Sequence, residues 1–192
     1  QIDFCDHIAL PYLSAIAKKR GHTTDMCVLP DFEKKLAEIH PDIVAYSLNI
    51  AGFDSIVAEH KRLKNIYGFK SIGGGPHVTL NQNLYPVADM DAWCVGEGEG
   101  AWEDYLECLE NGRSYDKVPN LITPNGQNPV RKLVTNLDII PFPDRDITLA
   151  NTFLKDVPKK TFYTTRGCPY GCTYCGNSFI NELYRGNKIV RR

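Results

Sequence analysis

The feature that most constrains the fold is a near-continuous apolar run at residues 42–48 (DIVAYSL), followed by an amphipathic helical pattern at residues 53–67. A strand that is apolar along its whole length is typical of a parallel sheet covered on both faces. The same order recurs, because strand-like runs at residues 70–73 and 91–95 are followed by a short helical pattern near residues 80–85 and a longer one at residues 99–110. Strands that alternate with helices predict βαβ units and a parallel sheet.

The N-terminal part continues this alternation but lacks an opening strand. The pattern predicts a helix at residues 8–20, a short strand at residues 23–29, and a helix at residues 32–40 that the side-chain oxygen of Asp31 caps. Because doubly wound domains usually open with a central strand, we expect the first strand to be missing or cut short, with residues 1–5 as its end. The fold class is therefore α/β, a doubly wound parallel sheet of the flavodoxin-like or Rossmann-like kind.

Changes in composition divide the chain into three parts. Residues 1–115 form the α/β domain. Residues 116–159 contain recurring prolines and read as a linker with a small hairpin, whose strands at 120–123 and 130–134 turn at Asn125-Gly126. Residues 160–192 begin with a strand at 160–165 and continue into a helix at 176–184.

Charge and hydropathy exclude some partners. The net charge of −1 gives no electrostatic reason to expect nucleic acid or an anionic membrane. No apolar run approaches the roughly 20 residues that a membrane-spanning helix requires. We therefore expect no nucleic-acid partner and no membrane partner.

Three of the seven cysteines lie close together. Cys168, Cys172 and Cys175 have the spacing C-x3-C-x2-C, with Gly167 and Gly171 beside them. An odd total and one tight cluster argue against a disulfide framework, so we expect a reducing compartment, the cytoplasm, and a metal site. Three thiolates can hold three irons of a [4Fe–4S] cluster and leave the fourth iron open. A zinc site with a fourth ligand, or a disulfide pair with a spare thiol, remains an alternative.

A second candidate site lies at the carboxyl ends of the predicted strands, where open parallel sheets bind ligands. Glycines there allow a flat ligand to approach the backbone, although a tight strand-to-helix turn or a phosphate cradle is an alternative for the triplet at 73–75. For Glu97 and Glu99 the alternative is charge complementarity with a helix N-terminus. The candidate ligand-binding residues are Ser47, Asn49, Gly73, Gly74, Gly75, His77, Gly96, Glu97 and Gly98.

The segment Arg166-Gly167-Cys168-Pro169-Tyr170-Gly171-Cys172-Thr173-Tyr174-Cys175 resembles the signature of the radical S-adenosylmethionine superfamily. The resemblance implies that the three cysteines bind [4Fe–4S], that the open iron binds S-adenosylmethionine, and that reductive cleavage gives a 5′-deoxyadenosyl radical. It places Tyr174 beside the adenine. It makes residues 160–192 the first βα unit of a truncated (β/α) barrel, and it implies an electron donor such as flavodoxin or ferredoxin.

Residues 8–150 resemble the cobalamin-binding domain that precedes the barrel in one subclass of that superfamily. The likeness rests on residues 10–22 and 41–47, on the loops 73–77 and 96–99, and on the exit at 137–145. The class includes anaerobic magnesium-protoporphyrin IX monomethyl ester oxidative cyclase and cobalamin-dependent methyltransferases. The D-x-H-x-x-G motif of other cobalamin domains is not matched around His7, so cobalamin rests on the family likeness.

The resemblance implies a function for the parent enzyme, namely methyl transfer to an unactivated centre, or oxidative cyclisation, on a small-molecule substrate. This chain is expected to be the N-terminal part of such an enzyme and to be inactive alone, because a (β/α) barrel needs on the order of 200 residues. Two other hypotheses remain: a cobalamin or small-ligand binding module without catalysis, and an α/β domain with a zinc-binding tail.

Overall fold

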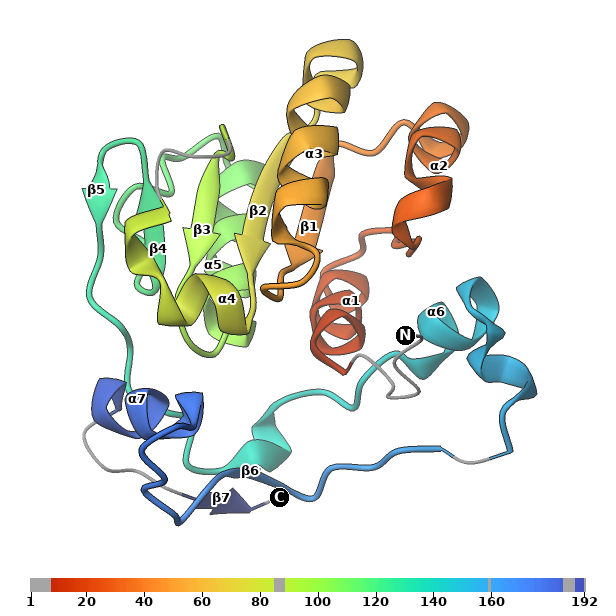
Figure 1. Cartoon of the computed structure of the whole chain (residues 1–192). Coiled ribbons are helices and arrows are strands. Elements are labelled where there is room, and N and C mark those ends of the chain that lie inside the picture. The colour runs from red at the N-terminus through yellow and green to blue at the C-terminus, as the bar shows by residue number, and fades with distance from the viewer. Residues whose placement is uncertain (1–7, 85–88, 159, 185–188, 192) are drawn as a thin grey trace.

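A computed structural model describes residues 8–84, 89–158, 160–184 and 189–191. Its main sheet has five strands in the order β1-β2-β3-β4-β5 (Figure 1). The first three are parallel, with Ile43 opposite Lys70 and Ile72 opposite Ala92. Their bounds are β1 (Ile43–Ser47), β2 (Lys70–Gly74) and β3 (Ala92–Cys94), followed by the antiparallel strands β4 (Leu121–Thr123) and β5 (Gly126–Gln127).

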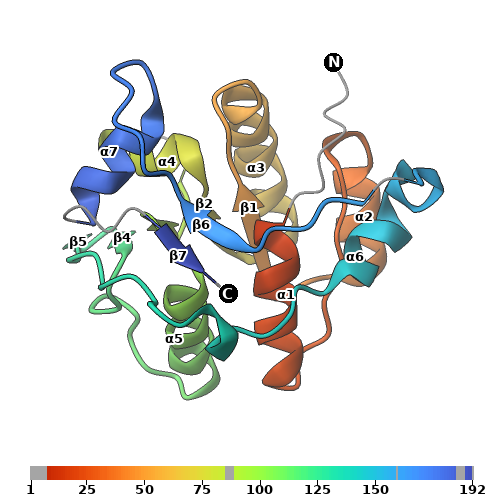
Figure 2. The same cartoon turned by 90° about the horizontal axis from the view of Figure 1, so that it is seen from below.

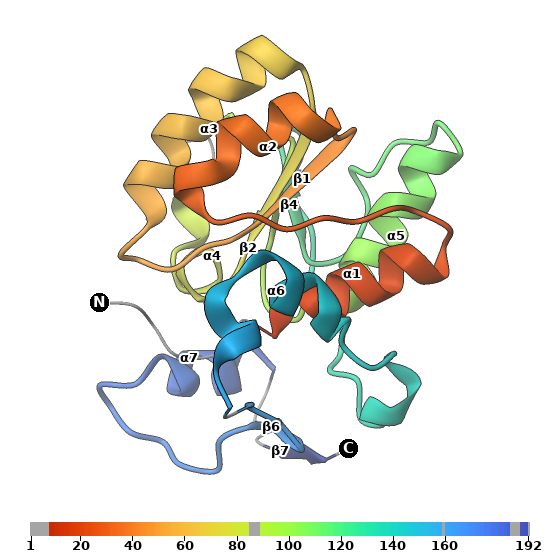
Figure 3. The ribbon, with the colours of Figure 1, turned by 90° about the vertical axis from the view of Figure 1, so that its right-hand side faces the viewer.

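Helices cover both faces of the sheet, as the edge-on view in Figure 3 shows. One face carries α1 (Ala9–Lys19) and α5 (Glu99–Glu110), and the other carries α3 (Phe53–Tyr67) and α4 (Pro76–Leu80), with α2 (Phe32–Ile39) beside α3. The alternation within β3 explains this arrangement. Ala92 and Cys94 point into the core under α1 and α5, whereas Trp93 points into the core under α3 and α4. The predicted α/β class with a mostly parallel, doubly wound sheet is confirmed.

The C-terminal segment passes below the sheet, at the end where the parallel strands terminate (Figures 1 and 2). A strand, β6 (Thr165–Gly167), is followed by helix α7 (Gly176–Leu183), which packs against α4. The predicted βα order is thus present, although β6 pairs antiparallel with β7 (Ile189–Arg191) and not with a parallel neighbour. The remaining short elements are η1 (Leu29–Asp31), η2 (Gln82–Leu84), η3 (Leu137–Ile139), α6 (Arg145–Asn151) and η4 (Phe153–Asp156).

Two predictions in the N-terminal part were wrong. Residues 23–28 form no strand, because none of the described strands pairs with them, although Thr24 and Cys27 are partly buried. The side chain of Asp31 does not cap α2. Asp31 is the last residue of η1, which runs directly into the helix, so its backbone lacks the extended conformation of an N-cap residue.

Three further predictions need correction. The hairpin turns at Pro124-Asn125, so its second strand is β5 rather than residues 130–134, and β4 pairs with β3 of the main sheet. Near residues 80–85, where a short helix was expected, the structure has the end of α4, which starts at Pro76 because proline favours the first helical turn, followed by the 3-10 helix η2. The strand expected at 160–165 begins only at Thr165.

The remaining predictions on the fold concern the first residues and the membrane. The incomplete first strand and His7 lie outside the described residues. Within the described part of the chain, no helix combines the length and the apolar character that crossing a bilayer demands.

Candidate functional site

The three cysteines lie in one loop, residues 168–175, which connects β6 to α7 (Figure 2). Side chains of α7 hold the backbone of this loop. Asn181 donates from Nδ2 to the Cys168 carbonyl oxygen at 3.1 Å, and Ser178 donates from Oγ to the Cys172 carbonyl oxygen at 2.6 Å. The helix that follows the cysteines therefore determines the path of the loop.

The donor chemistry of the loop suits a thiophilic metal, but the three cysteine side chains do not converge on a common point. Cys168, Cys172 and Cys175 are half-buried free thiols. Across the described residues, no three or more His, Cys, Asp or Glu side chains are grouped so that they could hold a metal ion. Tyr174, the predicted neighbour of adenine, is 91% exposed. Metal sites commonly acquire their geometry only with the metal, because binding and ordering are coupled.

The parallel strands end side by side, as predicted, and bring some of the candidate residues together. Ser47 pairs with Gly74 at the ends of β1 and β2. Asn49 is exposed, and its Oδ1 accepts a hydrogen bond from the Gly52 amide at 3.0 Å, so it shapes the turn into α3. His77 lies in the first turn of α4, and its ring centroid is 4.6 Å from that of Phe53.

The space beside several glycines at this edge is filled by other parts of the chain. A Cβ atom on Gly73 would lie 2.7 Å from the Trp93 ring, and one on Gly75, which has φ of 103°, would lie 2.8 Å from the Leu48 carbonyl oxygen. Gly75 thus forms the tight strand-to-helix turn that was the alternative to a ligand contact. At Gly74 and Gly98 a Cβ atom would meet only ordinary contacts, at 3.6 and 3.7 Å.

Arg166 connects the cysteine loop to the loop between β3 and α5. Its guanidinium lies 3.3 Å from a Glu97 carboxylate oxygen and 2.5 Å from one of Glu99, and it stacks 5.0 Å from the ring centroid of Tyr12. Burial raises the pKa of Glu97, and the nearby Arg166 opposes this rise. Burial lowers the pKa of Arg166, but its bonds to the two carboxylates outweigh that effect, so the net shift is upward.

Tyr184 reaches the same loop from the end of α7. Its hydroxyl accepts a hydrogen bond from the Glu97 amide at 2.7 Å, and the side chain is buried. The hydroxyl also fills the space beside Gly96, whose φ of 79° favours glycine. The Gly96 amide in turn donates to Thr79 Oγ1 of α4 at 3.0 Å.

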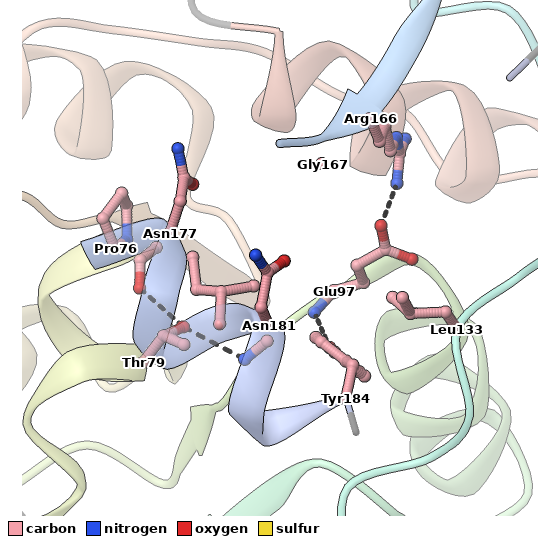
Figure 4. Close-up of a pocket in the computed structure, with 12 residues that line it drawn as sticks. Pro76, Thr79, Glu97, Leu133, Arg166, Gly167, Asn177, Asn181 and Tyr184 are labelled. Atoms are coloured by element: carbon pink, nitrogen blue, oxygen red, sulfur yellow. Dashed lines mark hydrogen bonds and ion pairs between the residues drawn. The ribbon is translucent and has the colours of Figure 1, made fainter. Parts of the chain in front are cut away.

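These contacts enclose a cavity of about 280 Å³ between the strand ends and the cysteine segment (Figure 4). Glu97, Tyr184 and Arg166 form one wall, and Asn177 and Asn181 of α7 contribute amide groups to the opposite side. The cavity is near the lower limit of small-molecule sites, roughly 300–1,000 Å³, so it can hold a polar group of modest size. The other lining residues are Gly75, Pro76, Thr79, Gly96, Leu133, Gly167 and Ile180.

The site also contains four residues to which the sequence analysis assigned no role, namely Arg166, Thr79, Asn181 and Tyr184. Arg166 stands two positions before Cys168, and this position was the only signal in the sequence. The partners of Arg166 and Tyr184 lie 67 and 87 residues away in the chain. No local pattern indicates such contacts.

No model of a known protein family matches the chain. It is similar in sequence to an uncharacterised methyltransferase of Pyrococcus horikoshii, with 28% identity over 96% of this chain and 43% of that protein. It is also similar to hopanoid C-3 methylase of Methylococcus capsulatus, with 29% identity over 93% of this chain and 37% of that protein. The chain therefore spans less than half the length of these two relatives.

Solved structures show the same fold. The cobalamin-dependent S-adenosylmethionine radical enzyme OxsB, with aqua-cobalamin and S-adenosylmethionine bound, matches with a TM-score of 0.68 and 21% identity over 88% of this chain and 26% of that chain. The radical S-adenosylmethionine methyltransferase TsrM of Kitasatospora setae, with cobalamin and a [4Fe–4S] cluster bound, matches with a TM-score of 0.63 and 17% identity over 98% of this chain and 41% of that chain. The chain is thus similar in sequence to methyltransferases, and in fold to cobalamin-dependent radical S-adenosylmethionine enzymes.

Proposed function

We propose that this chain is part of a cobalamin-dependent radical S-adenosylmethionine methyltransferase. The observation that carries the proposal is the position of the three-cysteine loop at the carboxyl ends of the parallel strands, the edge at which sheets of this class bind ligands. The two sites predicted from the sequence are therefore neighbours in the fold, and Arg166 and Tyr184 connect them.

Methyl transfer is favoured over oxidative cyclisation by the sequence relatives, both of which are named for methylation. The substrate class is a small molecule, since the radical methyltransferase TsrM has been solved with tryptophan as its substrate. An electron donor such as flavodoxin or ferredoxin belongs to the proposal. A reducing compartment such as the cytoplasm also belongs to the proposal, because an odd number of cysteines with one tight cluster is unlike a secreted disulfide framework.

Cys168, Cys172 and Cys175 are the proposed ligands of a [4Fe–4S] cluster. Thiolates are the usual ligands of such clusters, and three of them leave one iron free for S-adenosylmethionine. When bound, the cluster and S-adenosylmethionine supply one-electron chemistry. The chain's own contribution is to hold the loop backbone through Asn181 and Ser178 and to present the exposed ring of Tyr174 beside it.

Cobalamin is the proposed ligand of the strand-end edge. A cobalamin is far larger than the 280 Å³ cavity, so the cavity would receive only a part of it. Asn177 and Asn181 offer amide groups that suit a polar substituent. The open positions Gly74 and Gly98 permit backbone contact, with Ser47, Asn49 and His77 as further candidates, whereas Gly73, Gly75 and Gly96 support the edge from within.

Anaerobic reconstitution with iron and sulfide tests the cluster. The wild-type chain is expected to become brown and to bind nearly four irons per chain, as a [4Fe–4S] cluster requires. Cys172→Ala should lose this iron, whereas Cys108→Ala, a half-buried cysteine of α5 outside the loop, should retain it. Tightly bound zinc without iron uptake, or equal iron in the two variants, would overturn the proposal.

Titration with hydroxocobalamin tests the second ligand separately. The absorbance of cobalamin that co-elutes with the protein reports binding. Asn177→Trp fills the cavity and should abolish co-elution. Asn111→Trp, at the exposed end of α5, adds the same side chain away from the cavity and should not affect it. Failure of the wild-type chain to retain cobalamin would remove this part of the proposal and leave the cluster untouched.

A further inference from the structure

We propose that Arg166 and Tyr184 are positioning residues that fasten the two ends of the cysteine segment to one anchor loop. The cysteine segment is residues 166–184, and the anchor loop is residues 96–99, which follow β3 and include the first residue of α5. The inference rests on the proposed function, because it states how the proposed cluster loop is held at the strand ends.

The first contact with the anchor loop is made by a residue that precedes the cysteines in the sequence. Arg166 lies in β6, two residues before Cys168, and bridges Glu97 and Glu99. The exposed fractions of the three side chains are 23%, 24% and 14%, so water screens these charges only partly. A guanidinium can bond two carboxylates at once, which a single ammonium group does poorly. The stacking of Arg166 on Tyr12 adds a contact with α1.

The second contact with the anchor loop is made by a residue that follows the cysteines in the sequence. Tyr184 directly follows α7 as its C-cap residue, is 6% exposed, and accepts a hydrogen bond from the Glu97 amide. A Cβ atom on Gly96 would lie 2.0 Å from the Tyr184 hydroxyl oxygen, so only glycine allows this approach. Glu97 is therefore held through its carboxylate by one end of the segment and through its amide by the other.

The segment between these ends is held by hydrogen bonds of its own and by the packing of α7 against α4. Asn181 and Ser178 bond the carbonyl groups of Cys168 and Cys172 within the same segment, and Gly176 lies against the Leu80 side chain of α4. Its position relative to the sheet therefore depends on this packing and on the contacts of the two ends with the anchor loop. Two fastenings to one body act together, because each keeps the other close to its partner.

Hydrogen exchange on the metal-free 192-residue chain measures the fastening directly. The Glu97 amide and the amides of α7 are expected to exchange about tenfold faster in Arg166→Gln and in Tyr184→Phe, the effect of one lost hydrogen bond. The double variant should be faster than either, and Arg166→Lys should restore part of the protection. Arg62→Gln is the matched control, because Arg62 also bridges two glutamates, Glu33 and Glu59, between α2 and α3.

A second measurement separates positioning from simple stability. After reconstitution, the EPR spectrum and the midpoint potential of the cluster are recorded for the same variants. The double variant should shift both, and Arg62→Gln should shift neither. Amides of β2 and α3 serve as an internal check of folding. If the double variant does not fold, Tyr184→Phe, which removes a single oxygen atom, decides the outcome.

The possible results are distinguishable. Unchanged exchange in both single variants would overturn the inference. Faster exchange with an unchanged cluster spectrum and potential would also overturn it, because the contacts would then be structural only. Absence of iron uptake by the wild-type chain would overturn the proposed function, whereas the exchange measurement would still report whether the two ends are fastened.

Discussion

The Nδ1 atom of His60 lies 3.1 Å from the Tyr46 hydroxyl oxygen, and the His60 side chain is completely buried. Its Nε2 atom lies 3.4 Å from the Asp89 carbonyl oxygen. With the proton on Nε2, the neutral ring donates to Asp89 and accepts from Tyr46, so both nitrogens have partners. His60 thereby links α3 to β1 and to the segment that enters β3.

The burial of His60 predicts a pH-dependent stability. Burial lowers the pKa of His60, and this outweighs the opposite effect of its bond to Asp89. The unfolded chain takes up a proton as the pH falls through about 6.5, whereas the folded chain does so only at lower pH. The stabilisation that depends on a neutral His60 is therefore fully present above about pH 6.5 and declines below it.

Urea unfolding at several pH values between 7.5 and 5.5 checks this dependence. The wild-type free energy of unfolding should fall across this range, and His60→Gln should show a flatter profile. Profiles of equal slope would show that His60 does not carry the dependence.

Asp91 is expected to stabilise the opposite end of the sheet, where β2 begins. Its carboxylate accepts hydrogen bonds from the Ser71 amide at 2.8 Å and from Lys64 Nζ at 2.9 Å, and it is 14% exposed. Burial raises the pKa of Asp91, but the bonds from Lys64 and Ser71 outweigh it, so the pKa is lowered. The stabilisation is thus present above pH 3.8 and is lost as the pH falls through the folded value.

Replacement of Asp91 tests this network. Asp91→Asn should cost about 1–3 kcal/mol at pH 7, because Lys64 loses a partly buried counter-charge. Lys70→Met is the control, since Lys70 also faces Asp91 but is 54% exposed and should contribute less than about 1 kcal/mol. Denaturant unfolding at pH 7 compares the two, and similar costs would contradict the prediction.

Neighbouring glycines at the end of β2 are expected to differ in their tolerance of a side chain. Gly73→Ala places a Cβ atom 2.7 Å from both the Trp93 ring and the Met90 sulfur, so overpacking should cost about 1–3 kcal/mol. Gly74→Ala meets its nearest atom at 3.6 Å and should cost much less. Thermal unfolding of the two variants measures the difference, and equal midpoints would refute this account of Gly73.

Most of the sheet and its main helices could be predicted from the sequence, because burial imposes a repeat on each element separately. The apolar run of β1 and the amphipathic patterns of α3 and α5 are examples. Residues 23–28 could not be assigned correctly, since a strand requires a partner in space as well as a suitable composition. Thr24 instead bonds to Ser14 of α1 at 2.7 Å.

The candidate site was predictable only where its chemistry is local. The spacing of Cys168, Cys172 and Cys175 indicates a metal-binding loop regardless of the rest of the fold. Local sequence could not show which glycines adjoin open space for a ligand and which adjoin space that the chain itself fills. Whether the space beside Gly96 is open or filled depends on Tyr184, a residue that follows a different element and is distant in the sequence.

The antiparallel strand β4 has a consequence for how this sheet can be enlarged. The chain turns back beside β3 and ends this border of the sheet with the two exposed residues of β5. Among the described strands, β1 pairs on one side only, with β2. At the other border, β5 also pairs on one side only, but it is two residues long, so β1 offers an added strand the longer row of free backbone hydrogen-bonding groups.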